Sequence, residues 1–274
     1  AWQNRQPMAK VQKAVHESLV MPSEPPKPTE AGTPMAIPMS TPDTLTTTAW
    51  EQIGSGDDNP DGVHYEAGRV RQASYAYDNT VGATTLWLGA TGGGLWKAVD
   101  LLFAVAFVPM SDNLPGSPSV GAFLVQPGNS NNILIGSGDT GRYPGTGMYK
   151  TSDGAATWHP VNPIDGTSWP STFQKILTDL HDPSGQTVLA QGDTGIWLST
   201  NFGDTWSKVY SGPSSDLVQD PVNTYIWYAG VEGVGVLRST SYGQFFNQIG
   251  SGITGPIGRI SLAVSASAPE HLYA

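Results

Sequence analysis

The stretch LSTNFGDTWSKV, from Leu198 to Val209, has an altered copy upstream, KTSDGAATWHPV, from Lys150 to Val161. The two copies begin 48 residues apart. A fixed period of about 20 to 50 residues is the mark of a repeat architecture, in which each repeat is one small unit of secondary structure. The first question for this sequence is therefore what one repeat forms.

The sequence around both copies predicts short strands joined by tight turns. Four segments have the pattern of strand, Gly-rich hairpin, strand and polar turn: LWLGATGGGLWKAVD (86–100), ILIGSGDTGRYPGTGMYKTSD (133–153), VLAQGDTGIWLSTN (188–201) and IWYAGVEGVGVLRSTS (226–241). One more strand precedes each segment and a short outer strand follows it. Four strands repeated every 40 to 50 residues or so are typical of a β-propeller blade. A fifth unit, GRISLAVSASAPEHLYA (258–274), begins in the same way.

The composition agrees with an all-β chain and excludes several classes of partner. There are 33 glycines and 22 prolines, and only 13% of the residues are charged, which favours many turns over long amphipathic helices. The formal charge is −10 without any cluster of Lys and Arg, which argues against nucleic acid and against an anionic membrane surface. The longest apolar run, LLFAVAFV (101–108), is too short to span a membrane.

Residues 1–48 differ from the rest and predict a separate Pro/Thr-rich arm. Val11, Val15 and Leu19 are spaced as in one short amphipathic helix, and a segment dense in Pro, Ser and Thr follows. The arm is either a flexible leader or a segment that becomes ordered on a neighbouring subunit. The chain begins at Ala1 without a Met or a signal segment, which suggests a processed or trimmed protein.

The repeated turn has a structural explanation. In the pattern Ser/Thr-x-Asp/Asn-x-Gly-x-Thr-Trp, the short polar side chain accepts hydrogen bonds from its own turn, and the Gly adopts a positive φ. The Trp covers the turn and buries a large apolar surface. We place this turn between the third and fourth strands of a blade. Its residues are Thr151, Asp153, Thr157 and Trp158 in the first copy, with Ala155 in place of the Gly, and Ser199, Asn201, Gly203, Thr205 and Trp206 in the second.

These residues resemble the Asp-box, or BNR, repeat family, whose members include sialidases, xyloglucanase-type glycoside hydrolases, sortilin-like receptor domains and a photosystem assembly factor. The segments GRVRQASYAY and LWLGATGGGLWKA also look like the opening blade of secreted bacterial proteins with this repeat. The resemblance implies a β-propeller over residues 49–274 and an extracellular or cell-surface location in a bacterium. It implies no activity by itself, because the shared motif is not catalytic.

The number of blades leaves two alternatives. Propellers usually close with 4 to 8 blades, and an unfinished fifth blade leaves an unpaired strand edge. Either the chain is part of a longer propeller, or the arm and a strand at Trp50 complete a small ring.

Propeller topology predicts a ligand-binding rim on the face opposite the Asp boxes. The hairpins between second and third strands, and the crossovers between blades, bring to this rim Asp139, Arg142, Tyr143, Trp169, Asp193 and Glu232. Trp169 is a candidate platform for a sugar ring. Asp139 and Asp193 are the candidate pair of carboxylates for glycoside hydrolysis, which requires an acid and a nucleophile or base. The alternative is that Asp before Thr-Gly only forms a tight turn.

A calcium ion is the one cofactor that the sequence suggests. GDDNPDGVHYE matches the first half of an EF-hand-like loop, with oxygen ligands at Asp57, Asn59 and Asp61 and a replacement acid at Glu66. The match is incomplete, so an acidic solvated turn is the alternative. GSGDTG (136–141) has the glycine spacing of a dinucleotide site, but RYPGTGMYK follows it and cannot form the required helix.

Two functions remain after these observations. The first is a secreted or cell-surface β-propeller that acts as a binding or assembly module, with a protein partner, self-assembly through the arm, or a glycan as its ligand. The second is a carbohydrate-active enzyme, a glycoside hydrolase that uses the rim carboxylates. An intracellular or envelope assembly factor of the photosystem type is a third, more distant alternative.

Overall fold

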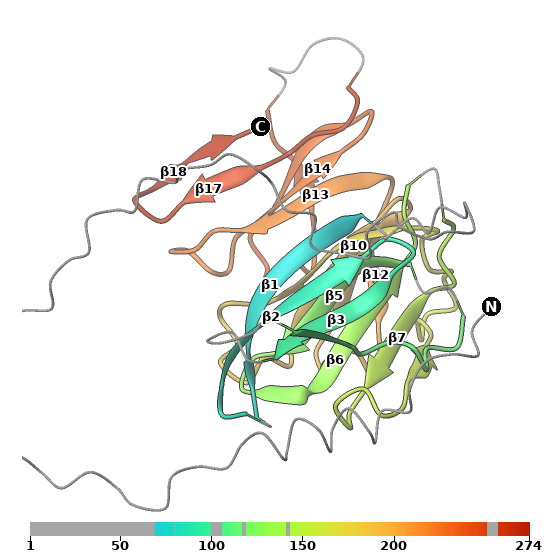
Figure 1. The fold of residues 1–274 in the computed structure, drawn as a ribbon. Coiled ribbons are helices and arrows are strands. Elements are labelled where there is room, and N and C mark those ends of the chain that lie inside the picture. The colour runs from blue at the N-terminus through green and yellow to red at the C-terminus, as the bar shows by residue number, and fades with distance from the viewer. Residues whose placement is uncertain (1–68, 80, 100–105, 117–118, 141–142, 251–256) are drawn as a thin grey trace, which may run out of the picture. The chain divides into compact units, whose positions relative to one another are not determined.

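The computed structural model describes residues 69–79, 81–99, 106–116, 119–140, 143–250 and 257–274. These residues form four antiparallel sheets of four strands and a fifth sheet of two (Figure 1). The fold prediction is therefore confirmed in its strand order, in its repeat boundaries and in the incomplete fifth unit. The predicted arm, residues 1–48, lies outside the described residues.

Each four-stranded sheet is a blade in which sequential strands pair in order. The first blade contains β1 (Val70–Asp78), β2 (Ala83–Ala90), β3 (Gly94–Val99) and β4 (Ala106–Pro109). The second contains β5 (Val120–Gln126), β6 (Asn129–Ser137), β7 (Met148–Thr151) and β8 (His159–Val161). The third contains β9 (Phe173–Thr178), β10 (Val188–Gly192), β11 (Gly195–Ser199) and β12 (Ser207–Ser211).

The fourth blade contains β13 (Ser214–Gln219), β14 (Trp227–Val231), β15 (Gly235–Ser239) and β16 (Asn247–Gln248). The fifth sheet pairs β17 (Ala263–Ser265) with β18 (Ala268–Tyr273). The first strands of successive blades are neighbours in space, since β1 contacts β5, β5 contacts β9, β9 contacts β13, and β13 contacts β17. This arrangement is the one expected when blades follow one another around a propeller.

The hydrophobic core consists of layers between blades. On β6, Ile133 and Ile135 pack toward the first blade, whereas Leu134 packs toward the third. On β10, Val188 packs toward the second blade, whereas Leu189 packs toward the fourth. Alternate side chains of a strand point to opposite faces, so an inner strand buried on both faces becomes continuously apolar. The outer strands β12 and β16 are much more exposed, which explains their weaker apolar pattern.

The repeated turn has the geometry that its sequence predicts. In the second blade the Asp153 carboxylate accepts hydrogen bonds from the Thr157 backbone N–H at 2.9 Å, the Thr157 hydroxyl at 2.5 Å and the Thr151 hydroxyl at 2.7 Å. These hydrogen bonds lower the pKa of Asp153 to about 2, the Thr157 hydroxyl contributing most. In the third blade Asn201 Oδ1 accepts from the Thr205 N–H at 2.9 Å. The turn therefore works with either Asp or Asn.

The tryptophans of the two turns are core residues. Trp158 lies between the first two blades and donates its indole N–H to the carbonyl of Met110 at 3.0 Å. Trp206 is fully buried between the second and third blades and donates to the carbonyl of Gly203 at 3.1 Å. Each turn thus anchors its blade to the preceding one, which gives a structural reason for the repetition.

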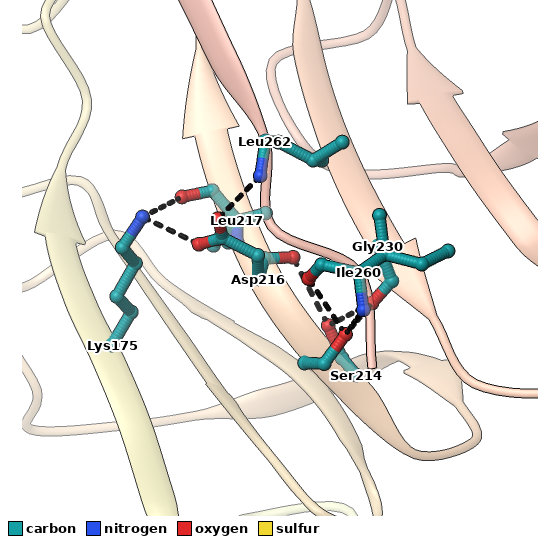
Figure 2. Close-up of polar contacts among 8 residues, drawn as sticks. Lys175, Ser214, Asp216, Leu217, Gly230, Ile260 and Leu262 are labelled. Carbon is teal, nitrogen blue, oxygen red and sulfur yellow. Dashed lines mark hydrogen bonds and ion pairs between the residues drawn. The ribbon is translucent and has the colours of Figure 1, made fainter. Parts of the chain in front are cut away.

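Polar side chains connect the inner strands of successive blades. Gln72 of β1 donates to the carbonyl of Phe123 on β5 and accepts from its N–H, both at 3.0 Å. Ser215 of β13 makes the same pair of bonds with Ile260, both at 2.9 Å. Figure 2 shows Asp216 of β13 between Lys175 of the third blade and the backbone N–H of Leu262. Blade order is therefore fixed by specific bonds as well as by apolar packing.

Candidate functional site

Asp139, one of the two candidate acids, follows β6 and is held in an ion pair. It is only 2% exposed. Its oxygens accept hydrogen bonds from Arg69 Nη2 at 2.9 and 3.0 Å, and Oδ1 also accepts from Arg71 Nη1 at 3.2 Å. Its backbone pairs with that of Tyr143, which closes the hairpin. Both carboxylate oxygens are therefore occupied by protein donors.

Arg69 and Arg71 are functional-site residues that the sequence prediction missed. Arg71 Nε also donates to the carbonyl of Gly121 at 3.1 Å, so one guanidinium connects β1, β5 and the β6–β7 hairpin. Burial lowers the pKa of Arg71, the neighbouring Arg259 and Arg69 act in the same direction, and Asp139 opposes them. The spacing of the two arginines in GRVRQ could have indicated this pair, because residues two apart at the start of a strand lie on the same face.

Asp193, the other candidate acid, lies in the β10–β11 hairpin and fixes the crossover that precedes β9. Its Oδ1 accepts from the Ser171 N–H at 3.0 Å, and its Oδ2 accepts from the Ser171 hydroxyl. Asp139 and Asp193 thus belong to different blades, and the structure gives each its own set of partners.

The other predicted rim residues are placed as follows. The phenol ring of Tyr143 lies against Gly92 in the β2–β3 hairpin of the first blade and stays 40% exposed. Glu232 is exposed in the β14–β15 hairpin, where its N–H donates to the carbonyl of Pro213 at 3.0 Å. Outside the described residues lie Arg142 and the predicted calcium ligands Asp57, Asn59, Asp61 and Glu66.

Trp169 lines an open cleft between the second and third blades, which we call the Trp169 cleft. The cleft has a volume of about 640 Å³ and is formed by the β6–β7 loop and the crossover that leads to β9. Every lining residue is uncharged: Gly145, Thr146, Gly147, Asn162, Pro163, Gly166, Thr167, Ser168, Trp169, Pro170 and Ser171. Hydroxyl and amide groups beside an aromatic ring are the surface that a neutral polyhydroxylated ligand requires.

The indole of Trp169 is fixed in position. It donates its N–H to the carbonyl of Val161 at 2.6 Å. Its ring packs against those of Phe173, Trp197 and Trp206, with centroids 5.4, 5.5 and 5.8 Å away. Glycine is also required at position 147, because a Cβ there would lie 2.9 Å from Trp169 Cδ1. The cleft therefore has a rigid aromatic element before any ligand arrives.

Asp165 shapes the crossover that forms the outer wall of the cleft. Its Oδ1 accepts from the Thr167 N–H at 3.0 Å and the Thr167 hydroxyl at 2.6 Å, and its Oδ2 accepts from the Lys208 N–H on β12 at 2.7 Å. These hydrogen bonds, that from Lys208 above all, lower the pKa of Asp165. The carboxylate thus stays charged at neutral pH and ties the loop to the outer strand of the third blade.

Within the residues that the structure describes, no group of three or more His, Asp or Glu side chains is arranged to hold a metal ion. The same part of the chain contains no helix with the length and apolarity needed to cross a membrane.

Comparison with known proteins finds distant relatives. No family model matches the chain. A xyloglucanase of Paenibacillus sp is 28% identical over 207 residues, which are 66% of this chain and 18% of that protein. A xyloglucanase of Hypocrea jecorina (strain QM6a) is 27% identical over 143 residues, 44% of this chain and 16% of that protein. The chain thus spans less than a fifth of the curated relatives it matches.

A solved structure supports the same fold. The chain superposes on an ancestral GH74 enzyme with a TM-score of 0.51 and 19% identity, over 68% of this chain and 24% of the other. The sheets are therefore blades of a β-propeller fold, as the sequence predicts, and xyloglucanases are among the distant relatives of the chain.

Proposed function

We propose that this chain is a β-propeller module that binds a neutral polysaccharide in the Trp169 cleft. The observation that carries the proposal is the combination of a fixed indole with a lining that has no charged side chain. Ligand sites are usually preformed concave surfaces with an apolar element and a few polar groups that set orientation. The Trp169 cleft has these properties and lies at a boundary between two blades.

Xyloglucan is the ligand class we favour. The two matched relatives are named xyloglucanases, and their similarity covers 44% and 66% of this chain. A neutral glycan fits the uncharged cleft, whereas a polyanion would meet a protein with a net charge of −10. Because such a polysaccharide lies outside the cell, we also propose the extracellular or bacterial cell-surface location that the sequence analysis predicts.

Binding is better supported than hydrolysis by the contacts of the candidate acids. A glycoside hydrolase needs two carboxyl groups that reach the glycosidic bond from either side. Asp139 is buried beneath Arg69 and Arg71, so a sugar would have to displace an arginine to reach it. Asp193 is engaged by the backbone and hydroxyl of Ser171. The relationship to xyloglucanases keeps hydrolysis as the alternative, and its residues remain Asp139 and Asp193.

A protein partner or self-assembly through residues 1–48 is the second binding mode that the sequence analysis predicts. Those residues lie outside the described part of the chain, so this mode stays a prediction.

The test is calorimetric titration of the full chain with xyloglucan oligosaccharides. Ser168 is exposed and lines the cleft, so Ser168→Arg fills the site without removing core packing. We expect it to weaken binding at least tenfold, while Ser267→Arg in the exposed β17–β18 turn binds like the wild type. Trp169→Phe keeps an aromatic ring beside Phe173 and should weaken binding less than Ser168→Arg.

Two results would overturn the proposal. One is wild-type affinity in Ser168→Arg, which would show that the glycan binds elsewhere or not at all. The other is release of reducing ends from xyloglucan by the wild type that disappears in Asp139→Asn or Asp193→Asn, which would assign the chain to the hydrolases.

A further inference from the structure

Three aromatic side chains from three separate loops meet on the surface of the third and fourth blades. The rings of His181 and Tyr242 have centroids 4.8 Å apart, and those of Tyr225 and Tyr242 are 6.3 Å apart. Leu180 and Val222, in the same loops, expose 61% and 54% of their surface. We call the three aromatic residues the Tyr242 patch. It involves none of the residues that line the Trp169 cleft.

The loops that carry the patch are fixed by hydrogen bonds. Asp179 Oδ1 accepts from the His181 N–H at 2.9 Å and from the side-chain amide of Gln219. Gln219 Oε1 in turn accepts from the Leu180 N–H at 2.8 Å. The N–H of Tyr242 donates to the carbonyl of Tyr225 at 3.1 Å. A surface whose backbone is already ordered loses less conformational entropy when a partner binds.

Tyr242 occupies a position where a large exposed side chain is unexpected. It has φ 55°, in the left-handed region, and corresponds in the repeated turn to Gly154 (φ 70°) and Phe202 (φ 45°). Glycine adopts a positive φ without strain, so Gly154 has no cost there. At Phe202 the strain of the positive φ is offset by full burial of the side chain. Tyr242 is 39% exposed, and its ring contacts those of His181 and Tyr225 at the surface. Its folding energetics alone give little reason for a tyrosine at this position.

The surroundings of the patch carry negative charge. Asp182 follows His181 directly, and the hydroxyl of Ser184 above all lowers the pKa of its carboxyl well below the usual range, so that it is ionised at neutral pH. Asp179 and Asp220 lie in the same two loops and are buried, and Arg238 is the cation that faces Asp220. Three of these four charged side chains are carboxylates, and Asp182 is the carboxylate that is not buried.

We propose that the Tyr242 patch is a docking site for an extended, proline-rich protein segment that carries Lys or Arg. Proline-rich segments adopt a preformed polyproline II helix and dock their prolines on aromatic surfaces. The rings here contact one another and are tilted by 41° and 62°, so their exposed faces and edges form an uneven aromatic surface rather than one flat platform. A Lys or Arg next to the prolines would meet Asp182.

The charge of the molecule disfavours a second copy as the occupant. Each chain has a formal charge of −10, and two acidic surfaces repel one another. A neutral sugar would gain nothing from the carboxylates around the patch. The proposal goes beyond the glycan site of the Trp169 cleft and does not depend on it.

Fluorescence anisotropy with a labelled peptide of sequence Pro-Pro-Lys-Pro-Pro-Lys-Pro tests the proposal on the full chain. We expect Tyr242→Gly to weaken binding at least tenfold, and Gly154 shows that glycine adopts this turn conformation. Tyr225→Ala should weaken it similarly. Tyr75→Ala, which removes a 71% exposed tyrosine from β1, is the matched control and should bind like the wild type. Binding should also weaken as salt is raised.

Other occupants appear as distinct outcomes. If the full-length variant Pro25→Ala/Pro26→Ala/Pro28→Ala binds the peptide more tightly than the wild type, the chain's own proline-rich segment competes for the site, which supports the proposal. Wild-type affinity in both Tyr242→Gly and Tyr225→Ala would overturn it. So would the absence of peptide binding together with xyloglucan binding that Tyr242→Gly removes, because the patch would then be a glycan platform.

Discussion

Lys175 and Asp216 form an ion pair across the boundary between the third and fourth blades, with 2.5 Å between Nζ and Oδ1. Lys175 also donates to the carbonyl of Leu217 at 3.1 Å, and the second oxygen of Asp216 accepts from the N–H of Leu262 at 2.7 Å (Figure 2). One carboxylate therefore joins three consecutive blade units. Leu262 is buried, so removal of the carboxylate leaves its N–H without a partner, whereas the 37% exposed Lys175 can still meet water.

We predict that Asp216→Ala destabilises the protein by about 2 to 4 kcal/mol, because it leaves a buried N–H and a partly buried ammonium unpaired. Lys150 and Asp204 form the matched control, an ion pair of 2.6 Å in which Asp204 is 64% exposed. Asp204→Ala should cost about 1 kcal/mol or less. Urea unfolding of both variants measures the difference, and equal losses would show that Asp216 has no special role.

Asp139 gives a second prediction about a carboxylate in a hairpin. Asp139→Ala leaves the largely buried Arg71 without its acidic partner. We expect this variant to destabilise the protein by about 2 to 4 kcal/mol. Glu232→Ala, in the equivalent hairpin of the fourth blade, removes an exposed carboxylate and should change stability by about 0.5 kcal/mol or less. Thermal unfolding distinguishes the two. If Asp139→Ala left the stability of the protein unchanged, the ion pair would not be structural, and a catalytic role for Asp139 would be favoured.

Gly203 tests how closely the repeated turn approaches the preceding blade. A Cβ at Gly203 would lie 2.5 Å from Leu134 Cδ2, whereas one at Gly233 would meet nothing within 4 Å. Both glycines have positive φ, 81° and 77°. The left-handed backbone should therefore lower the free energy of unfolding by about 1 to 2 kcal/mol in both Gly→Ala variants. Overpacking should lower it by about 1 to 3 kcal/mol more in Gly203→Ala alone. Similar unfolding midpoints in the two variants would contradict the packing explanation.

Asp153 gives a pH-dependent prediction with a definite sign. Its pKa in the folded protein is about 2, below the ordinary 3.8, so its ionised form stabilises the fold above pH 4 or so. This contribution is lost as the pH falls from about 4 to about 2. A carboxyl ¹³C titration by NMR should show a midpoint near 2, and a midpoint near 3.8 would contradict the hydrogen-bond geometry.

Asp153→Asn is the control for that prediction, since Asn201 already occupies the same position in the third blade with the same contact to the backbone. We expect the variant to fold with similar stability below pH 2, where the wild-type carboxyl is protonated. The stability difference between wild type and variant should then appear between pH 2 and pH 4. If the stability difference between wild type and Asp153→Asn did not change with pH, packing rather than the charge of Asp153 would be its cause.

The fold was predictable because its signals are local. Turn residues such as Asp153 and Asn201 form hydrogen bonds within four residues of themselves, and the alternation on strands such as β6 follows from backbone geometry. The sequence also predicted an unfinished fifth unit, which the structure shows as β17 and β18. Local chemistry repeated at a fixed period thus indicated both the blade and its copies.

The site was less predictable because its contacts are distant along the chain. Arg69 and Asp139 are separated by 70 residues, and no periodicity connects an opening strand with a hairpin of the next blade. The sequence placed Asp139 on an open rim, and the structure buries it under two arginines. The sequence predicted Trp169 as a candidate sugar platform, but the cleft beside it depends on Gly147 and on the loop that Asp165 holds.

The sequence by itself therefore determined the blade, its period and its turns, since these depend on hydrogen bonds and burial patterns within a few residues. Only the tertiary structure decided which side chains meet across blade boundaries: Asp139 with Arg71, Asp216 with Lys175, and Tyr242 with His181. The physical reason is that a β-propeller blade specifies its own strands by local chemistry, whereas its surfaces are composed of loops from neighbouring blades whose relative positions are set by the packing between sheets.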